Sequence, residues 1–135
     1  MKKLLTLLLV VALTVCTLLV GCNETPLVLK ESDTFVVITA KDSGENTTLI
    51  DYINSLDEYK DMFVIEGGMV TSIDGVANKA DWSECWMIYT SDEEFSSVEW
   101  GTVEYDGKTY GSAVLGAESL IVKNDCLYIF VYQSF

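Results

Sequence analysis

The chain has 135 residues, of which 50% are hydrophobic, and its 21 acidic residues against 8 basic ones give a net charge of −13. It contains no histidine, so the Ser-His-Asp and Cys-His catalytic arrangements and an imidazole zinc site are excluded. The acidic balance also argues against binding to nucleic acid phosphates or anionic lipid headgroups, which pair with Lys and Arg side chains.

The first 21 residues are typical of a secretory signal peptide. Lys2 and Lys3 give a short positive start, and an apolar stretch follows over residues 4–20. The last residues of this region, Leu19-Val20-Gly21-Cys22, resemble the bacterial lipobox, in which the cysteine is diacylated and becomes the mature N-terminus. An apolar stretch of this length would also suit a transmembrane anchor. The cysteine at this position favours lipidation instead.

Lipidation of Cys22 determines where the protein is expected to lie. Two acyl chains such as palmitate anchor a protein stably, whereas a single chain binds reversibly. We therefore expect an extracytoplasmic protein anchored to the bacterial cell membrane, with residues 22–33 as a short tether that holds the only proline. Removal of Lys2 and Lys3 leaves 6 lysines against 21 acids, a balance of −15. Solubility at a crowded surface explains this charge more simply than cation binding does.

Residues 34–135 are expected to form one domain, because this length supports a single core. The β-branched run over residues 34–40 predicts a buried strand. A helix is predicted from Thr48 to about Leu56, since Thr48 lies three residues before Asp51, as in a capping box, and apolar residues recur at helical spacing. Residues 59–65 are expected to begin the next strand.

Two Asp-Gly pairs, Asp74-Gly75 and Asp106-Gly107, predict hairpin turns, because a type I′ turn needs positive φ at both central positions. The expected strands are residues 69–73 and 83–89, then a hairpin over 102–110 and a last hairpin that pairs 119–123 with 126–132. Residues 91–97 form an acidic loop without the ligand spacing of a calcium loop. One helix and six or seven mostly antiparallel strands indicate an α+β fold.

The last of these strands is apolar at successive positions. Its two faces carry Cys126, Tyr128, Phe130 and Tyr132 on one side and Leu127, Ile129 and Val131 on the other. A strand that is apolar on both faces is expected to be central or covered on both sides.

The residues favour binding over catalysis. No Walker loop or GxGxxG motif follows a strand, and the neighbouring carboxylates Glu93 and Glu94 cannot face each other across a scissile bond. We therefore predict that the protein is not an enzyme, requires no cofactor and holds no metal.

Aromatic residues provide the candidate binding site. The ligand contacts are expected from Trp82, Trp86, Tyr89 and Trp100, with backbone groups near Gly68 and Gly75. Core and cross-strand packing is the alternative role for Trp86 and Tyr89, and it is the favoured one for Trp86. Trp82 lies in a polar stretch, which favours a surface role.

The segments GGMVTSIDGV and WMIYTSD resemble the transcobalamin-like C-terminal domain, a family of small β-grasp-like domains in bacterial surface lipoproteins and vertebrate cobalamin carriers. The resemblance covers roughly residues 35–135. It implies a β-grasp-like fold and a ligand such as cobalamin, another corrinoid or a similar flat molecule. The carriers add a large helical domain that this chain lacks, so a partner chain or a cleft of weaker affinity would have to serve as the site here.

Two questions stay open at the level of sequence. Outside the cytoplasm, Cys85 and Cys126 could form a disulfide, or both could be buried free thiols. The domain could also be a surface module for protein interaction or adhesion rather than a ligand carrier.

Overall fold

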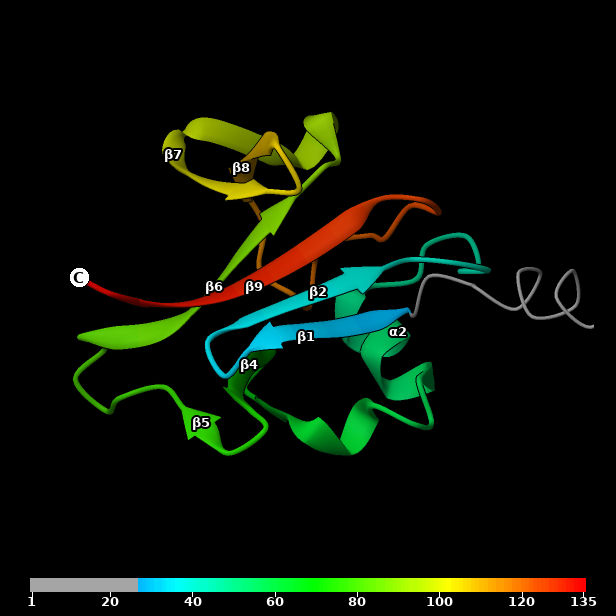
Figure 1. Ribbon diagram of the computed structural model, residues 1–135. Coiled ribbons are helices and arrows are strands. Elements are labelled where there is room, and N and C mark those ends of the chain that lie inside the picture. Colours follow the sequence, from blue (N-terminus) through cyan, green and yellow to red (C-terminus); the bar gives the residue numbers. More distant parts are fainter. Residues whose placement is uncertain (1–26) are drawn as a thin grey trace, which may run out of the picture.

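The structure, a computed structural model, describes residues 27–135, which form two antiparallel sheets and one α-helix (Figure 1). The predicted signal peptide and Cys22 lie outside the described residues. The strands are β1 (Val28–Ser32), β2 (Phe35–Thr39), β3 (Phe63–Glu66), β4 (Met69–Ile73), β5 (Val76–Ala77), β6 (Glu84–Thr90), β7 (Ser96–Tyr105), β8 (Lys108–Ala113) and β9 (Leu127–Ser134). The helix is α2 (Leu49–Ser55), and short 3-10 turns occupy Lys60–Met62 and Glu93–Phe95.

The larger sheet has six strands in the order β1-β2-β9-β6-β8-β7. The last strand, β9, therefore lies in the middle, between β2 and β6. Tyr128 and Phe130 on one face of β9 are fully buried, and so is Ile129 on the other. The prediction of a strand covered on both sides is confirmed, because each face of β9 packs into a core of its own.

The first core lies between the large sheet and a layer made of α2 and the small sheet β3-β4-β5. Thr48 caps the helix, since its hydroxyl accepts a hydrogen bond of 3.1 Å from the N–H of Asp51. The helix buries Leu49, Tyr52 and Ile53 against the sheet. The helix predicted from Thr48 to about Leu56 is confirmed, with its cap.

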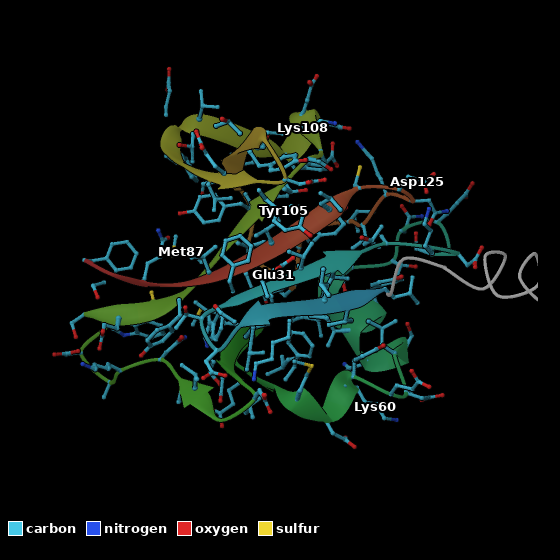
Figure 2. All side chains as sticks on the ribbon, viewed as in Figure 1. Glu31, Lys60, Met87, Tyr105, Lys108 and Asp125 are labelled. Atoms are coloured by element: carbon cyan, nitrogen blue, oxygen red, sulfur yellow. The ribbon has the colours of Figure 1, made fainter. Side chains whose placement is uncertain are left out.

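The second core lies on the opposite face of the large sheet, where the sheet curls and side chains of β7 and β8 pack with those of β2, β6 and β9 (Figure 1). The rings of Phe35 in β2 and Tyr105 in β7 stack with centroids 5.9 Å apart. The Tyr105 hydroxyl also donates to Glu31 Oε1 of β1 at 3.2 Å, and the two side chains lie close together in Figure 2. The two edge strands of the sheet thus come into contact.

Both predicted Asp-Gly turns are present. Asp74 and Gly75 join β4 to β5 with φ values of 48° and 84°, and Asp106 and Gly107 join β7 to β8 with 49° and 76°. Positive φ at both central residues is the type I′ geometry that suits the twist of an antiparallel hairpin.

Three predicted segments differ from the structure. The tether prediction for residues 22–33 is wrong from Val28 onward, because Val28–Ser32 is the edge strand β1. Residues 119–123 do not pair with β9; Ile121 instead bridges Thr48 at the start of the helix. The strand expected from residue 59 begins only at Phe63, after a 3-10 turn.

The architecture is α+β and mostly antiparallel, as the sequence predicts. Within residues 27–135, no helix is long and apolar enough to cross a membrane.

Candidate functional site

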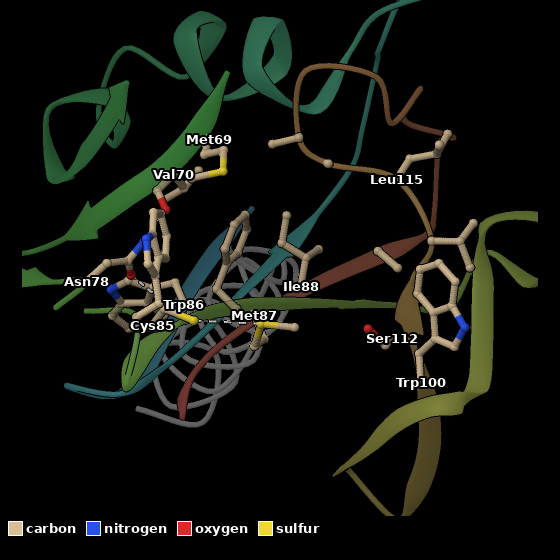
Figure 3. A pocket seen from close by; sticks show the side chains of 16 residues that line it. Met69, Val70, Asn78, Cys85, Trp86, Met87, Ile88, Trp100, Ser112 and Leu115 are labelled. Carbon is tan, nitrogen blue, oxygen red and sulfur yellow. Dashed lines mark hydrogen bonds between the residues drawn. The ribbon is translucent and has the colours of Figure 1, made fainter. Parts of the chain in front are cut away.

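An apolar pocket of about 440 Å³ opens where two strands of the large sheet separate (Figure 3). Strand β6 pairs with β9 along its whole length but with β8 only through Tyr89 and Thr90. Beyond Ala113 the chain leaves β6 and runs to the helix, where the N–H of Ile50 donates to the carbonyl of Ala117 at 3.2 Å. The pocket lies between this departing segment, β6 and β4.

The pocket lining contains no charged side chain and includes all three tryptophans of the chain. In Figure 3, Trp100 and Leu115 lie on one side of the pocket and Met69 and Asn78 on the other. The lining residues are Met69, Val70, Asn78, Trp82, Cys85, Trp86, Met87, Ile88, Trp100, Ser112, Ala113, Val114, Leu115, Gly116, Ala117 and Phe130.

Trp86 belongs both to the pocket wall and to the first core. Its indole N–H donates to the carbonyl of Val76 at 2.7 Å, and its backbone N–H donates to Asn78 Oδ1 at 2.8 Å. The ring contacts that of Tyr132, with centroids 5.4 Å apart. These contacts hold the indole in place, so Trp86 forms a rigid wall rather than a mobile ligand clamp.

Trp82 and Trp100 lie at the rim and are largely exposed, by 53% and 66%. Trp100 is carried by a bulge, because the β7–β8 register shifts between Ser97 and Thr102 and four residues project from the strand. Trp82 sits in a turn with φ +61, closed by a 2.9 Å hydrogen bond from its N–H to the carbonyl of Lys79. Exposed tryptophans beside an apolar pocket are typical of a binding surface.

The prediction that Tyr89 lies beside the pocket is wrong. Tyr89 points to the opposite face of the sheet, where it packs with Val37 and Ile129 in the second core. Its hydroxyl donates to Gln133 Oε1 at 2.5 Å. Tyr89 therefore has the packing role that the sequence left open for it.

The two glycines are also not part of the pocket wall. Gly75 lies in the β4–β5 turn with no atom near the position of a Cβ. Gly68 lies one residue before the lining Met69, has a φ of +78, and is covered by the side chain of Glu118, which a Cβ would meet. Gly68 thus makes room for the Glu118 side chain, which is also absent from the pocket lining.

The disulfide alternative is wrong, and both cysteines are free. Cys85 lies opposite Gln133 in the β6–β9 ladder, and Gln133 is seven residues beyond Cys126 in the sequence. At about 3.3 Å per residue this is roughly 23 Å, far beyond the reach of a disulfide. Burial raises the pKa of the Cys85 thiol, which keeps it protonated at neutral pH and a poor nucleophile.

The pocket-lining residues that sequence reasoning missed are chiefly Met69 and residues 112–117. The run Val114-Leu115-Gly116-Ala117 is apolar and follows a strand, which was the available signal. Its place in the pocket depends on β8 leaving β6, and that is a tertiary feature. Across residues 27–135, no group of three or more Cys, Asp or Glu side chains is arranged to hold a metal ion.

Comparisons with protein-family models, curated proteins and solved structures found no match to this chain. A function must therefore be inferred from the pocket and the residues around it.

Proposed function

We propose that this is an extracytoplasmic binding protein, anchored through a diacylated Cys22, that takes a flat and largely apolar ligand into the pocket between β4, β6 and residues 112–117. The observation that carries the proposal is an uncharged pocket flanked by two exposed tryptophans. Its size lies within the range of about 300–1,000 Å³ that is usual for small-molecule sites. The protein is proposed to bind rather than to catalyse.

A flat ligand suits this pocket for a physical reason. Trp82 and Trp100 present broad apolar faces to solvent, and covering such faces is favourable by about 25 cal/mol for each Å² removed from water. The fixed indole of Trp86 offers a preformed wall, so little side-chain entropy is lost there on binding.

A corrinoid or similar tetrapyrrole is the ligand we favour, inserted by one edge because the pocket is smaller than the whole ring system. Support comes from the resemblance of GGMVTSIDGV and WMIYTSD to the transcobalamin-like C-terminal domain. The packing of one helix on a mixed-length antiparallel sheet is compatible with the β-grasp-like fold that this family has. We propose that fold assignment together with the ligand.

Calorimetry and absorbance titration of the soluble form, residues 23–135, with cobalamin, cobinamide and haem test the proposal. We expect saturable binding of at least one of them. Trp82→Ala and Trp100→Ala should each weaken it by about 1–3 kcal/mol, the usual range for an anchoring side chain. Phe135→Ala is the matched control, since Phe135 is 76% exposed and lies outside the pocket. No heat and no spectral change at high micromolar ligand would contradict the proposal.

A protein-interaction or adhesion module is the second candidate. It is favoured by the exposed apolar side chains of Val98, Trp100 and Leu115, which are 68%, 66% and 38% accessible. A photo-crosslinking residue at position 98 tests it in cells. A single discrete crosslinked protein, together with failure of all three titrations, would favour this function over ligand binding.

A further inference from the structure

We infer that Ser112 orients the ligand of this pocket, and that its hydroxyl donates a hydrogen bond to an uncharged carbonyl group, such as an amide, at the edge of the ligand that enters the pocket. This ligand chemistry rests on the proposed function, that a flat ligand is inserted by one edge, and adds which kind of group that edge bears.

Ser112 lies where strands β6 and β8 separate. It pairs with Tyr89 in the β6–β8 ladder, and the next residue of β8, Ala113, has no partner in β6. Ser112 lines the pocket, although only 3% of the residue is exposed. Figure 3 shows its hydroxyl oxygen pointing from β8 toward β6, into the space that the separation opens.

The Ser112 hydroxyl has no hydrogen-bond partner within residues 27–135. Such a hydroxyl on a buried residue is an exception, because the large majority of buried polar side-chain atoms are paired. Since the oxygen faces the pocket, a ligand in the pocket can supply the missing partner.

The other polar atoms deep in the pocket are already bonded. The Oδ1 of Asn78 accepts from the N–H of Trp86 at 2.8 Å, and its Nδ2 donates to the carbonyl of Val70 at 3.4 Å. The indole N–H of Trp86 donates to the carbonyl of Val76. Of the two side-chain oxygens in the lining, that of Ser112 is therefore the one open to a ligand.

The group that meets this hydroxyl is uncharged. No charged side chain lines the pocket, so a buried carboxylate or ammonium group would lose its hydration without gaining a counter-ion. That loss costs far more than the burial of a hydrogen-bonded amide. A carbonyl oxygen can accept from the hydroxyl without this penalty.

Two corrinoids with the same ring test the edge chemistry. The side chains end in amides in dicyanocobinamide and in carboxylates in dicyanocobyrinate. Absorbance titrations into residues 23–135 are made in 0.5 M NaCl, which screens the long-range repulsion between an acidic protein and an anionic ligand. We expect cobinamide to bind about tenfold more tightly or better, because the carboxylates stay unpaired in the pocket. This comparison needs no variant of the protein.

Ser112→Ala tests the orienting residue. It should weaken cobinamide binding about two- to tenfold, the range for one neutral hydrogen bond. It should not lower the free energy of unfolding, because the hydroxyl that it removes has no partner in the unliganded protein. Ser97→Ala is the matched control, since Ser97 lies opposite Ser112 in the β7–β8 ladder but outside the pocket lining, and it should leave binding unchanged.

The outcomes separate the two proposals. Three results overturn the role of Ser112 or the neutral edge while the pocket function stands: unchanged cobinamide affinity in Ser112→Ala, equal affinity for the two corrinoids, or binding of haem but of neither corrinoid. A loss of stability in Ser112→Ala that matches its loss of binding also overturns the role, because the hydroxyl would then have a partner within the protein. If neither corrinoid binds and haem does not bind, both proposals are overturned.

Discussion

At the scale of single residues, the three tryptophans divide into one that supports the fold and two that are largely exposed beside the pocket. Trp86 is 6% exposed, and both its nitrogen donors are hydrogen-bonded. Trp82 and Trp100 make no comparable contacts with the core and are more than half exposed. Replacement of these residues should therefore affect different properties.

Trp86→Ala should lower the free energy of unfolding by about 3–5 kcal/mol, because it leaves a cavity in the first core and removes the bond to Val76. Trp82→Ala should change it by no more than about 0.5 kcal/mol, as is usual for an exposed side chain. Urea denaturation measures both values. Similar losses in the two variants would contradict the division of roles.

Cys22→Ala should abolish lipidation, since acylation needs the thiol that follows Leu19-Val20-Gly21. Metabolic labelling with a palmitate analogue measures this, and Cys16→Ala is the matched control in the same apolar stretch. Labelling of the Cys22 variant at the level of the unaltered protein would show that the predicted anchor is wrong.

Tyr128 should make stability depend on pH in the alkaline range. Burial raises its pKa to about 12, against about 10 in an unfolded chain. Below pH 10 the hydroxyl is protonated in both states and the stabilisation is complete. Between about pH 10 and 12 the unfolded state ionises first, so the free energy of unfolding falls as pH rises.

Urea denaturation at pH 9 and pH 11 measures this effect. The fall should be larger in the unaltered protein than in Tyr128→Phe, by about 1 kcal/mol. The Phe variant also loses the acceptor of the 2.8 Å bond from the Lys123 N–H, which lowers its stability at both pH values alike. An equal fall in the two proteins would count against a buried, neutral Tyr128.

At the scale of elements, α2 is short and depends on its cap. Thr48→Ala should lower the free energy of unfolding by about 1 kcal/mol, because the Asp51 N–H loses its acceptor. Thr48→Ser should keep most of the stability of the unaltered protein, because serine retains the hydroxyl. Chemical denaturation of both variants gives the values. Equal stability of the Ala and Ser variants would exclude a capping role for the hydroxyl.

The elements that sequence predicted correctly are those with strong local signals. The capped helix and the Asp-Gly turns depend on residues close together in the sequence. The successive apolar residues of β9 indicate burial on both faces of the strand, and both faces are buried. Strand β1 was missed because only Val28 of this strand is buried, so its polar composition resembled a tether. Residues 119–123 were misassigned because Leu120 and Val122 alternate like a strand but are buried beside the helix.

The site was predictable in part. Residue type alone indicated Trp82, Trp86 and Trp100, and all three line the pocket. Strand alternation alone does not exclude Tyr89, because Cys85 and Met87 lie on the same face of β6 and line the pocket. Tyr89 is excluded because it lies where β6 pairs with β8, which is again a tertiary feature. The contribution of residues 112–117 was not predictable, because it follows from where β8 leaves β6.

At the scale of the whole molecule, the curled sheet has two cores and one weak point in its pairing. The edge strands β1 and β7 meet through Glu31 and Tyr105, which stabilises the second core. On the other face, α2 and the small sheet cover most of the large sheet but leave the separation of β6 and β8 uncovered. The apolar pocket is the consequence of that separation.

One measurement tests the central claim, that this pocket binds the ligand, most directly. The three tryptophans all line the pocket, so the three indole N–H signals in a ¹H–¹⁵N spectrum of residues 23–135 report on binding there. Titration with cobinamide and, separately, with cobalamin should shift the Trp82 and Trp100 signals saturably with at least one of them, while the backbone amide of Gly107 at the β7–β8 turn stays unchanged. Unmoved indole signals with both compounds, or shifts confined to residues outside the pocket, would contradict the account.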